Sequence, residues 1–221
     1  MKFLLFLLGI FLSINCYAQT IRKDTRPESV KEDYMNTYQA NRISKIDLLS
    51  ALHAMGVRLF SFPMSPRFTK TYKLEVNLAE YVNGKLVNTK SISPDENNLY
   101  YYYIKKKQYA DYINKIKFIA HDVDTACLLT VNVMGNTIGG IKLKKHLVRP
   151  NQYYLWRSYK STNWKRGVEI PLLAYSSSWY DKKDDVERSC GPDDLSNDKA
   201  ATKKLLNNSP HYFIVSYKIS K

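Results

Sequence analysis

Aromatic and basic residues alternate in the segment NQYYLWRSYKSTNWKRG, residues 151–167. Flat aromatic rings stack on the apolar faces of sugars, while guanidinium and ammonium groups pair with carboxylates or sulfates. An anionic glycan is therefore the ligand that this composition fits best. The first candidate binding set consists of Trp156, Tyr159, Trp164, Lys165 and Arg166. The alternative is that these rings fill a core and the basic stems pack over them, and full burial of the rings would remove the site.

A second aromatic and basic segment is NNLYYYYIKKKQYADY, residues 97–112. In a strand, Tyr101 and Tyr103 would lie on one face and Tyr100 and Tyr102 on the other, so the four rings cannot all face one ligand. The favoured interpretation is structural, with two of the rings packed inward and the lysines at the solvated end of the strand. An exposed binding platform over residues 100–107 is the second candidate contact set.

Residues for catalysis or metal binding form no recognised motif. The chain contains no G-x-S-x-G elbow, no H-E-x-x-H helix and no glycine-rich phosphate loop. His121 and Asp122 would lie on opposite faces of a strand, which argues against an acid–base pair. The acidic segment 181–199 lacks the regular spacing of a calcium loop, so a solvated loop is favoured there. The sequence accordingly predicts no catalytic residue, no metal and no cofactor.

The first residues, MKFLLFLLGIFLSINCYAQT, have the form of a secretory signal peptide. The small residues Cys16 and Ala18 fit cleavage after Ala18, so residues 1–18 would be removed. The apolar run is too short for a membrane-spanning helix. Lipidation at Cys16 is disfavoured, because Ser13 and Asn15 stand where a lipoprotein signal has an aliphatic and a small residue. The protein is therefore expected to be secreted or periplasmic.

The chain carries a formal net charge of +14. The leader contains one lysine, so its removal leaves +13. Such a charge favours anionic partners. Export argues against nucleic acid and in favour of an anionic glycan, a cell-envelope component or an acidic protein.

Two cysteines, Cys127 and Cys190, follow the predicted cleavage site. An exported protein could join them in a disulfide. Cys127 lies in the alternating segment ACLLTVNV and could equally be a small buried apolar residue.

The local patterns predict an extended segment over residues 19–42 and a single β-rich domain over residues 43–221. Ser44 and Asp47 form a capping box for a helix that Gly56 ends. Asn83-Gly84 and Gly135-Asn136 fit the turns of two hairpins, with a bulge at Gly139-Gly140. Short helices are expected over residues 106–115 and 198–207. Further strands are expected at 57–62, 99–104, 116–123, 152–159, 168–175 and 211–219.

Strands outnumber helices and no strand-helix-strand repeat occurs, so the predicted fold is a mainly β (α+β), antiparallel β-sandwich-like domain with two or three short helices. The block GVEIPLLAYSSSWYDKK, RSCGPDDL and SPHYFIVSY resembles an uncharacterised family of secreted proteins from the Bacteroidetes. This resemblance covers the last third of the chain and implies no activity.

Three functions are compatible with these patterns. The leading hypothesis is a secreted or periplasmic, non-enzymatic binding module for an anionic partner. The first alternative is a structural or protein-interaction component of the envelope, since tyrosines concentrate at interfaces. The second is a secreted hydrolase, which would require a pocket with convergent carboxylates or a cysteine–histidine contact.

Overall fold

The computed structural model describes residues 43–64, 70–93, 99–113, 115–133, 136–160, 166–192, 194–196 and 200–220. Two compact units divide the chain, Met1–Ala51 and Leu52–Lys221, and residues 43–51 are the described part of the first. The predicted leader (1–18) and extended segment (19–42) lie outside the described residues. None of the helices in the described ranges combines the length and the apolar character that a membrane crossing requires.

Helix α3 (Lys45–Ala54) has the N-terminal cap that the sequence predicted. The hydroxyl of Ser44 accepts a hydrogen bond from the backbone N–H of Asp47 at 3.1 Å. The Asp47 carboxylate accepts one from the backbone N–H of Ser44 at 2.9 Å, and this bond lowers the pKa of the carboxyl group. After the helix, Gly56 adopts a φ of 76° and turns the chain into strand β1.

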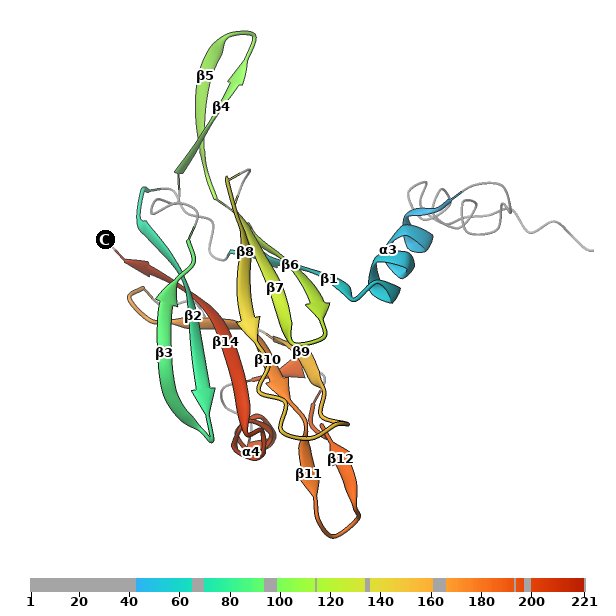
Figure 1. The fold of residues 1–221 in the computed structure, drawn as a ribbon. Coiled ribbons are helices and arrows are strands. Elements are labelled where there is room, and N and C mark those ends of the chain that lie inside the picture. The colour runs from blue at the N-terminus through green and yellow to red at the C-terminus, as the bar shows by residue number, and fades with distance from the viewer. Residues whose placement is uncertain are drawn as a thin grey trace, which may run out of the picture. The chain divides into compact units, whose positions relative to one another are not determined.

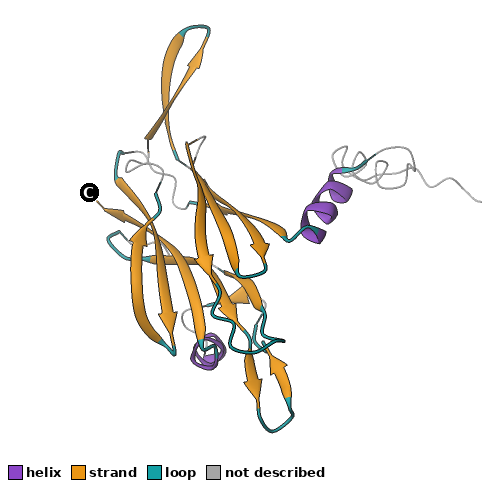
Figure 2. Cartoon of the chain, in the orientation of Figure 1, coloured by secondary structure: helices purple, strands orange, loops and turns teal. Residues whose placement is uncertain are grey.

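Strands make up most of the second unit (Figures 1 and 2). A second helix, α4 (Ala200–Asn208), lies close to the predicted position. The strands are β1 (Val57–Pro63), β2 (Lys73–Val82), β3 (Lys85–Ser91), β4 (Leu99–Ile104), β5 (Lys107–Tyr112), β6 (Lys115–Val123), β7 (Ala126–Val133), β8 (Asn136–Lys144), β9 (Tyr154–Tyr159), β10 (Ile170–Ser177), β11 (Trp179–Asp181), β12 (Val186–Arg188), β13 (Asp194–Leu195) and β14 (His211–Ser220).

Strand pairing produces two larger sheets and two hairpins. One sheet has the order β1-β6-β7-β8 and is antiparallel throughout. The other has the order β13-β9-β10-β14-β2-β3, in which the two-residue strand β13 pairs in parallel with β9 and the other pairs are antiparallel. The hairpins β4-β5 and β11-β12 form separate two-stranded sheets. This arrangement confirms the mainly β, antiparallel prediction.

The two larger sheets pack against each other through one apolar core. Trp156 of β9 stacks on Tyr175 of β10 with a centroid distance of 4.5 Å, and Phe60 of β1 lies 5.6 Å from the same indole ring. These rings join the two sheets, because β1 belongs to the four-stranded sheet. Alternate residues of the strands complete the core, including Leu74, Val76, Leu78, Phe118, Leu129, Val131, Val215 and Ile219.

Both predicted hairpins are present. Asn83 and Gly84 have φ angles of 48° and 73° between β2 and β3, as a type I′ turn requires. In the β7-β8 hairpin, the register shifts by one residue on β8 between the partners of Leu129 and Val131. Gly140 lies at this bulge with a φ of 70°, which confirms the predicted position. Gly135 of its turn lies outside the described residues.

The helix predicted over residues 106–115 is wrong. This segment contains the turn and the second strand of the β4-β5 hairpin. Lys105 and Lys106 form the turn with φ angles of 48° and 68°, and Tyr109 and Tyr112 pair with residues of β4. The apolar residues fit helical spacing, but pairing with the tyrosine-rich strand decides the structure.

Both cysteines of the described residues are free. Cys127 is buried in the core, and burial raises the pKa of its thiol to about 12. Cys190 is exposed. The structure therefore agrees with Cys127 acting as a small apolar core residue.

Candidate binding surface

The first candidate set does not form one accessible surface. Trp156 and Tyr159 have exposed fractions of only 8% and 7%. They lie three residues apart on β9 and so point to opposite sides of the sheet. Trp156 belongs to the main core, whereas Tyr159 packs with Leu195 and Leu205 in a second cluster. Neither ring is available for stacking on a ligand in this structure.

Arg166 is the one described residue among the other three members of that set. Trp164 and Lys165 lie outside the described residues. Arg166 is exposed, and its guanidinium group lies 5.1 Å from the centroid of the Tyr72 ring. The sequence suggested a single aromatic platform because these rings are close in the chain, but alternation along β9 places Trp156 and Tyr159 on opposite faces of the sheet.

The β4-β5 ribbon carries the second candidate set. Among the described residues, β4 and β5 pair only with each other, and in Figure 1 the ribbon lies clear of the two larger sheets of its unit. Tyr101 and Tyr103 share one face, with exposed fractions of 60% and 69%. Opposite them on β5 are Ala110 and Gln108, whose smaller side chains leave the rings uncovered. Two outward-facing rings agree with the predicted division of the tyrosines, but Tyr102 of the other face is also 37% exposed and is not packed inward as predicted.

The other face of the ribbon carries a stacked aromatic pair. Tyr102 and Tyr109 are direct partners in the register, and their ring centroids lie 5.6 Å apart. Both rings are partly exposed, as is Ile104 next to them. The ammonium group of Lys107 lies 5.7 Å from the centroid of Tyr109, within range of a cation–π contact. Aromatic surface is thus presented on both faces.

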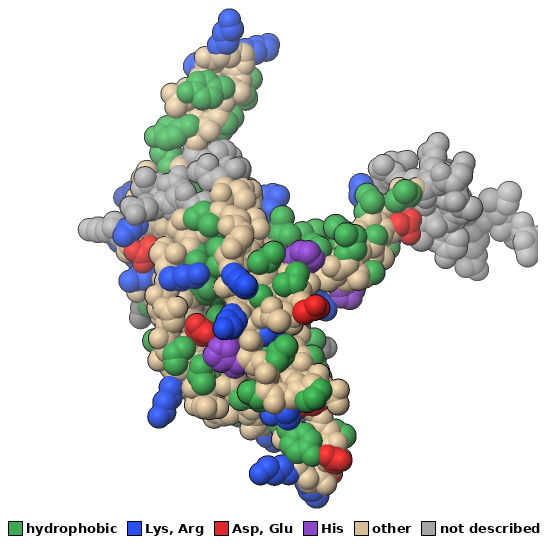
Figure 3. All heavy atoms as spheres, in the orientation of Figure 1, with side chains coloured by type: hydrophobic (Ala, Val, Ile, Leu, Met, Phe, Trp, Pro, Cys, Tyr) green, Lys and Arg blue, Asp and Glu red, His purple; other side chains and the backbone are tan. Residues whose placement is uncertain are grey.

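Three lysines, Lys105, Lys106 and Lys107, form the end of the ribbon, which we call the lysine tip. All three are exposed. Figure 3 shows basic side chains at this end and hydrophobic side chains along the ribbon below it. Asp111, the acidic residue of β5, lies near the other end, opposite Tyr100. The ribbon can therefore offer aromatic faces and positive charge to one ligand.

Carboxylates of the acidic segment after β10 pair with arginines, one inside the segment and one before β9. Arg188 pairs with Asp181 and Asp184, and Arg149 pairs with Glu187. Glu187 also accepts a hydrogen bond from the Ser178 hydroxyl at 2.8 Å. These arginines neutralise carboxylates that a calcium ion would otherwise need as ligands.

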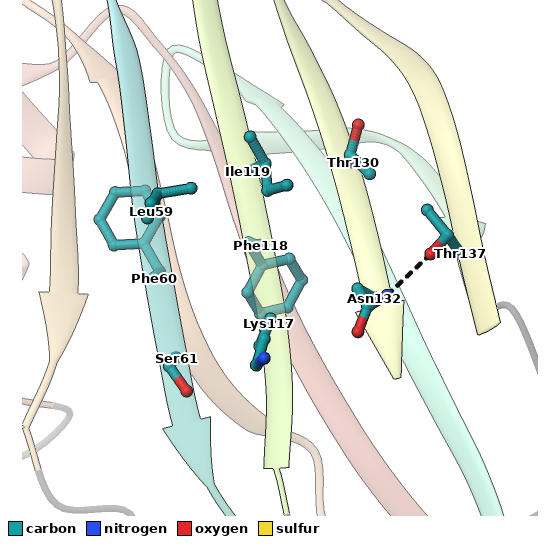
Figure 4. Close-up of a pocket in the computed structure, with 9 residues that line it drawn as sticks. All are labelled: Leu59, Phe60, Ser61, Lys117, Phe118, Ile119, Thr130, Asn132 and Thr137. Carbon is teal, nitrogen blue, oxygen red and sulfur yellow. Dashed lines mark hydrogen bonds between the residues drawn. The ribbon is translucent and has the colours of Figure 1, made fainter. Parts of the chain in front are cut away.

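A hollow of about 500 Å³ lies on the outer face of the four-stranded sheet (Figure 4). Leu59 and Ile119 provide exposed apolar surface there, and the Asn132 amide donates a hydrogen bond to Thr137 at 2.7 Å. None of the nine lining residues is a carboxylate, a histidine or a cysteine. Lys117 is the one titratable side chain among these nine, so the hollow does not bring an acid group and a base group together.

His121 and Asp122, the histidine–aspartate pair considered from the sequence, lie in different environments. Asp122 accepts a hydrogen bond from the hydroxyl of Tyr175 and pairs with Lys145 at 3.2 Å. His121 is exposed on the neighbouring position of β6. The two side chains thus lie on opposite faces, as alternation predicted.

One cluster of polar side chains was missed from the sequence. Glu80, His146 and His211 have ligand atoms that all lie within 4.8 Å of one another, and this is the one such group of three or more found in the described part of the chain. The two imidazole rings stack, with centroids 4.0 Å apart and an interplanar angle of 6°. Burial lowers the pKa of His211. The three residues are too far apart in the sequence for a spacing motif to reveal them.

A family profile matches residues 28–221, which include the C-terminal third on which the sequence resemblance rested. No curated protein and no solved structure matches the chain. By this match, the chain belongs to the family of the domain of unknown function DUF5041.

Proposed function

We propose that this chain is a secreted or periplasmic, non-enzymatic binding module that holds an anionic glycan or cell-envelope component on its β4-β5 ribbon. The observation that carries the proposal is the exposure of tyrosine rings on both faces of a ribbon that ends in three lysines. Contiguous exposed apolar surface on a folded protein is typical of interaction and ligand-binding sites.

The ribbon suits a ligand that is flat and apolar on one side and negatively charged elsewhere. Tyr101 and Tyr103 are two residues apart on the same face, so their attachment points are separated by about 7 Å along the strand. Rings at this spacing can stack on neighbouring sugar units. The lysine tip can pair with carboxylate, sulfate or phosphate groups of the same ligand.

A protein partner is the second candidate, and one observation favours it. Among the described residues, each strand of the ribbon has one neighbour, so each has a free edge that could accept a strand from another protein. The tyrosine rings would then line the pockets that receive alternate side chains of the added strand. The same ribbon serves in both cases, and the experiment below separates them.

Binding of the full chain to acidic and neutral polysaccharides, at low and high salt, tests the proposal. One variant replaces Tyr101 and Tyr103 by alanine. A second replaces Lys105 by asparagine and Lys106 by glycine, because Asn-Gly keeps the type I′ turn while removing two charges. The control variant replaces Lys142 and Lys144, two exposed lysines of β8, by glutamine.

We expect the tyrosine variant to bind roughly tenfold more weakly or worse at both salt concentrations, because stacking of tyrosine rings on sugar faces does not depend on salt. The turn variant should weaken binding to acidic polysaccharides at low salt only. The control should bind like the wild type. Equal losses in the turn variant and the control would mean that general charge is responsible. Absence of polysaccharide binding would direct the search to a protein partner.

A further inference from the structure

The core between the two larger sheets ends in polar side chains at one place. On β2, Leu74, Val76 and Leu78 are buried at alternate positions, and Glu80 continues the same alternation. On β14, His211 likewise continues the face that carries Phe213 and Val215. Figure 1 shows that β2 and β14 are neighbours, and the register places Glu80 opposite Phe213, two residues from His211.

The third member of this cluster comes from the other sheet. His146 follows the end of β8, a strand of the four-stranded sheet, whereas β2 and β14 belong to the six-stranded sheet. Its side chain is 44% exposed, and the side chain of His211 is only 2% exposed. The cluster therefore combines a fixed, buried imidazole with one that solvent can reach.

The Nε2 atoms of both imidazole rings lie near one carboxylate oxygen. The Nε2 atom of His211 lies 3.1 Å from Oε1 of Glu80, and the Nε2 atom of His146 lies 4.0 Å from it. Ligands of a tetrahedral zinc ion stand about 2.0–2.2 Å from the metal, which places them a little over 3 Å from each other. The two imidazole planes are nearly parallel, so the exposed His146 side chain has to rotate for its Nε2 atom to face the same ion and for the three atoms to reach that spacing.

The environment of His211 leaves its Nε2 atom suited to a metal. The Tyr154 hydroxyl lies 2.7 Å from Nδ1 of His211, and it accepts a hydrogen bond from the backbone N–H of His146 at 2.9 Å. A hydrogen bond at one ring nitrogen orients the ring and selects which nitrogen can coordinate. Tyr154 is therefore placed to act as the supporting residue that metal-ligating histidines usually have.

We propose that Glu80, His146 and His211 bind one divalent transition-metal ion of the zinc type, which joins the two sheets at this end of the core. Two imidazoles and one carboxylate match the ligand preference of zinc and similar first-row metals, whereas calcium and magnesium prefer oxygen ligands alone. Three protein ligands leave the fourth position of a tetrahedral ion open to water.

Calorimetric titration of the metal-free full chain with zinc chloride tests the site, with calcium chloride as a second titrant. We expect one zinc ion per chain and a rise in the melting temperature when zinc is present, because the ion binds the folded state. The variants His146→Ala and Glu80→Gln should weaken zinc binding by at least tenfold. Tyr154→Phe should weaken it less, by loss of ring orientation.

Matched controls come from the two histidines outside the cluster. His53→Ala and His121→Ala remove exposed imidazoles elsewhere and should leave zinc binding unchanged. Circular dichroism of each metal-free variant establishes that it is folded, and His146 is chosen over the buried His211 for this reason. Zinc binding that survives in both His146→Ala and Glu80→Gln, or a chain that binds no zinc at micromolar concentration, would overturn the proposal.

Discussion

Tyr102 of β4 and Tyr109 of β5 stack directly across the ribbon, with an angle of 19° between their ring planes. Cross-strand aromatic pairs contribute roughly 0.2–1 kcal/mol to a sheet. A two-stranded ribbon has few other sources of stability, because both strands lie at an edge. The pair that shapes one face of the proposed binding surface is thus also a main support of the ribbon.

Replacement of Tyr109 by alanine should loosen the ribbon without unfolding the sheets. We expect amide hydrogen exchange in β4 and β5 to become several-fold faster, while exchange in β14 stays the same. Tyr103→Ala is the control, because Tyr103 faces Gln108 instead of an aromatic partner. Equal acceleration in the two variants would show that the stacked pair has no special role.

Trp156 should behave as a core residue. Trp156→Ala removes a ring that packs against Phe60 and Tyr175, and we expect a loss of about 3–5 kcal/mol in the free energy of unfolding. Trp156→Phe should cost less, since an aromatic ring is kept. Urea unfolding measures both values. If Trp156→Phe instead left stability unchanged and abolished polysaccharide binding, the ring would have a ligand role that its burial argues against.

Features that depend on sequence neighbours were predictable. The Ser44–Asp47 cap and the Asn83-Gly84 turn are each specified by a few adjacent residues, and the structure contains both. Alternating burial on β2 and β6 likewise follows from local pattern. The helix predicted over residues 106–115 was wrong because their apolar spacing fits a helix and a strand equally, and only pairing with β4 decides between the two.

Features that depend on distant contacts were not predictable. Trp156 and Tyr159 are close in the chain but belong to different clusters, because two layers cover the two faces of β9. Glu80, His146 and His211 are brought together by strand pairing and by the packing of one sheet on the other. Which of these residues become neighbours depends on the order of the strands, and no local sequence motif specifies that order.

Cys127 and Cys190 should differ in reactivity. Only a thiolate is alkylated, and Cys127 is buried with a pKa raised to about 12, whereas Cys190 is exposed. Treatment of the folded chain with iodoacetamide at about pH 8 should therefore modify Cys190 and leave Cys127 unmodified until urea is added. Peptide mass spectrometry identifies the sites. A Cys127–Cys190 disulfide would protect both residues even in urea and would contradict the structure.

Gly191 leaves little room for a side chain. A Cβ atom there would lie 2.1 Å from Cδ1 of the buried Leu205. We expect Gly191→Ala to lower the free energy of unfolding by about 1–3 kcal/mol through overpacking. Gly139→Ala is the control, because its nearest neighbour, a Thr130 oxygen, would be 3.5 Å away. The cost of Gly191→Ala should shrink when Leu205 is also alanine, and an unchanged cost would place the strain elsewhere.

Protonation of Glu187 should lower the free energy of unfolding in acid. Hydrogen bonds from Arg149 and Ser178 hold the pKa of this carboxyl below its ordinary value of 4.5. The unfolded chain therefore takes up a proton at a higher pH than the folded chain does. It follows that the carboxylate's contribution is complete above the unfolded pKa and is lost as the pH falls through the folded pKa.

The variant Glu187→Gln tests this contribution through urea unfolding at several pH values. We expect the variant to be less stable than the wild type by about 1–2 kcal/mol at neutral pH, and the difference to shrink as the pH falls below the ordinary value of 4.5. Glu75→Gln is the control, because Glu75 pairs with Lys73, whose side chain is 46% exposed, and such pairs contribute little. A difference that stays constant from neutral to acid pH would show that packing of the side chain, and not its charge, stabilises this end of the fold.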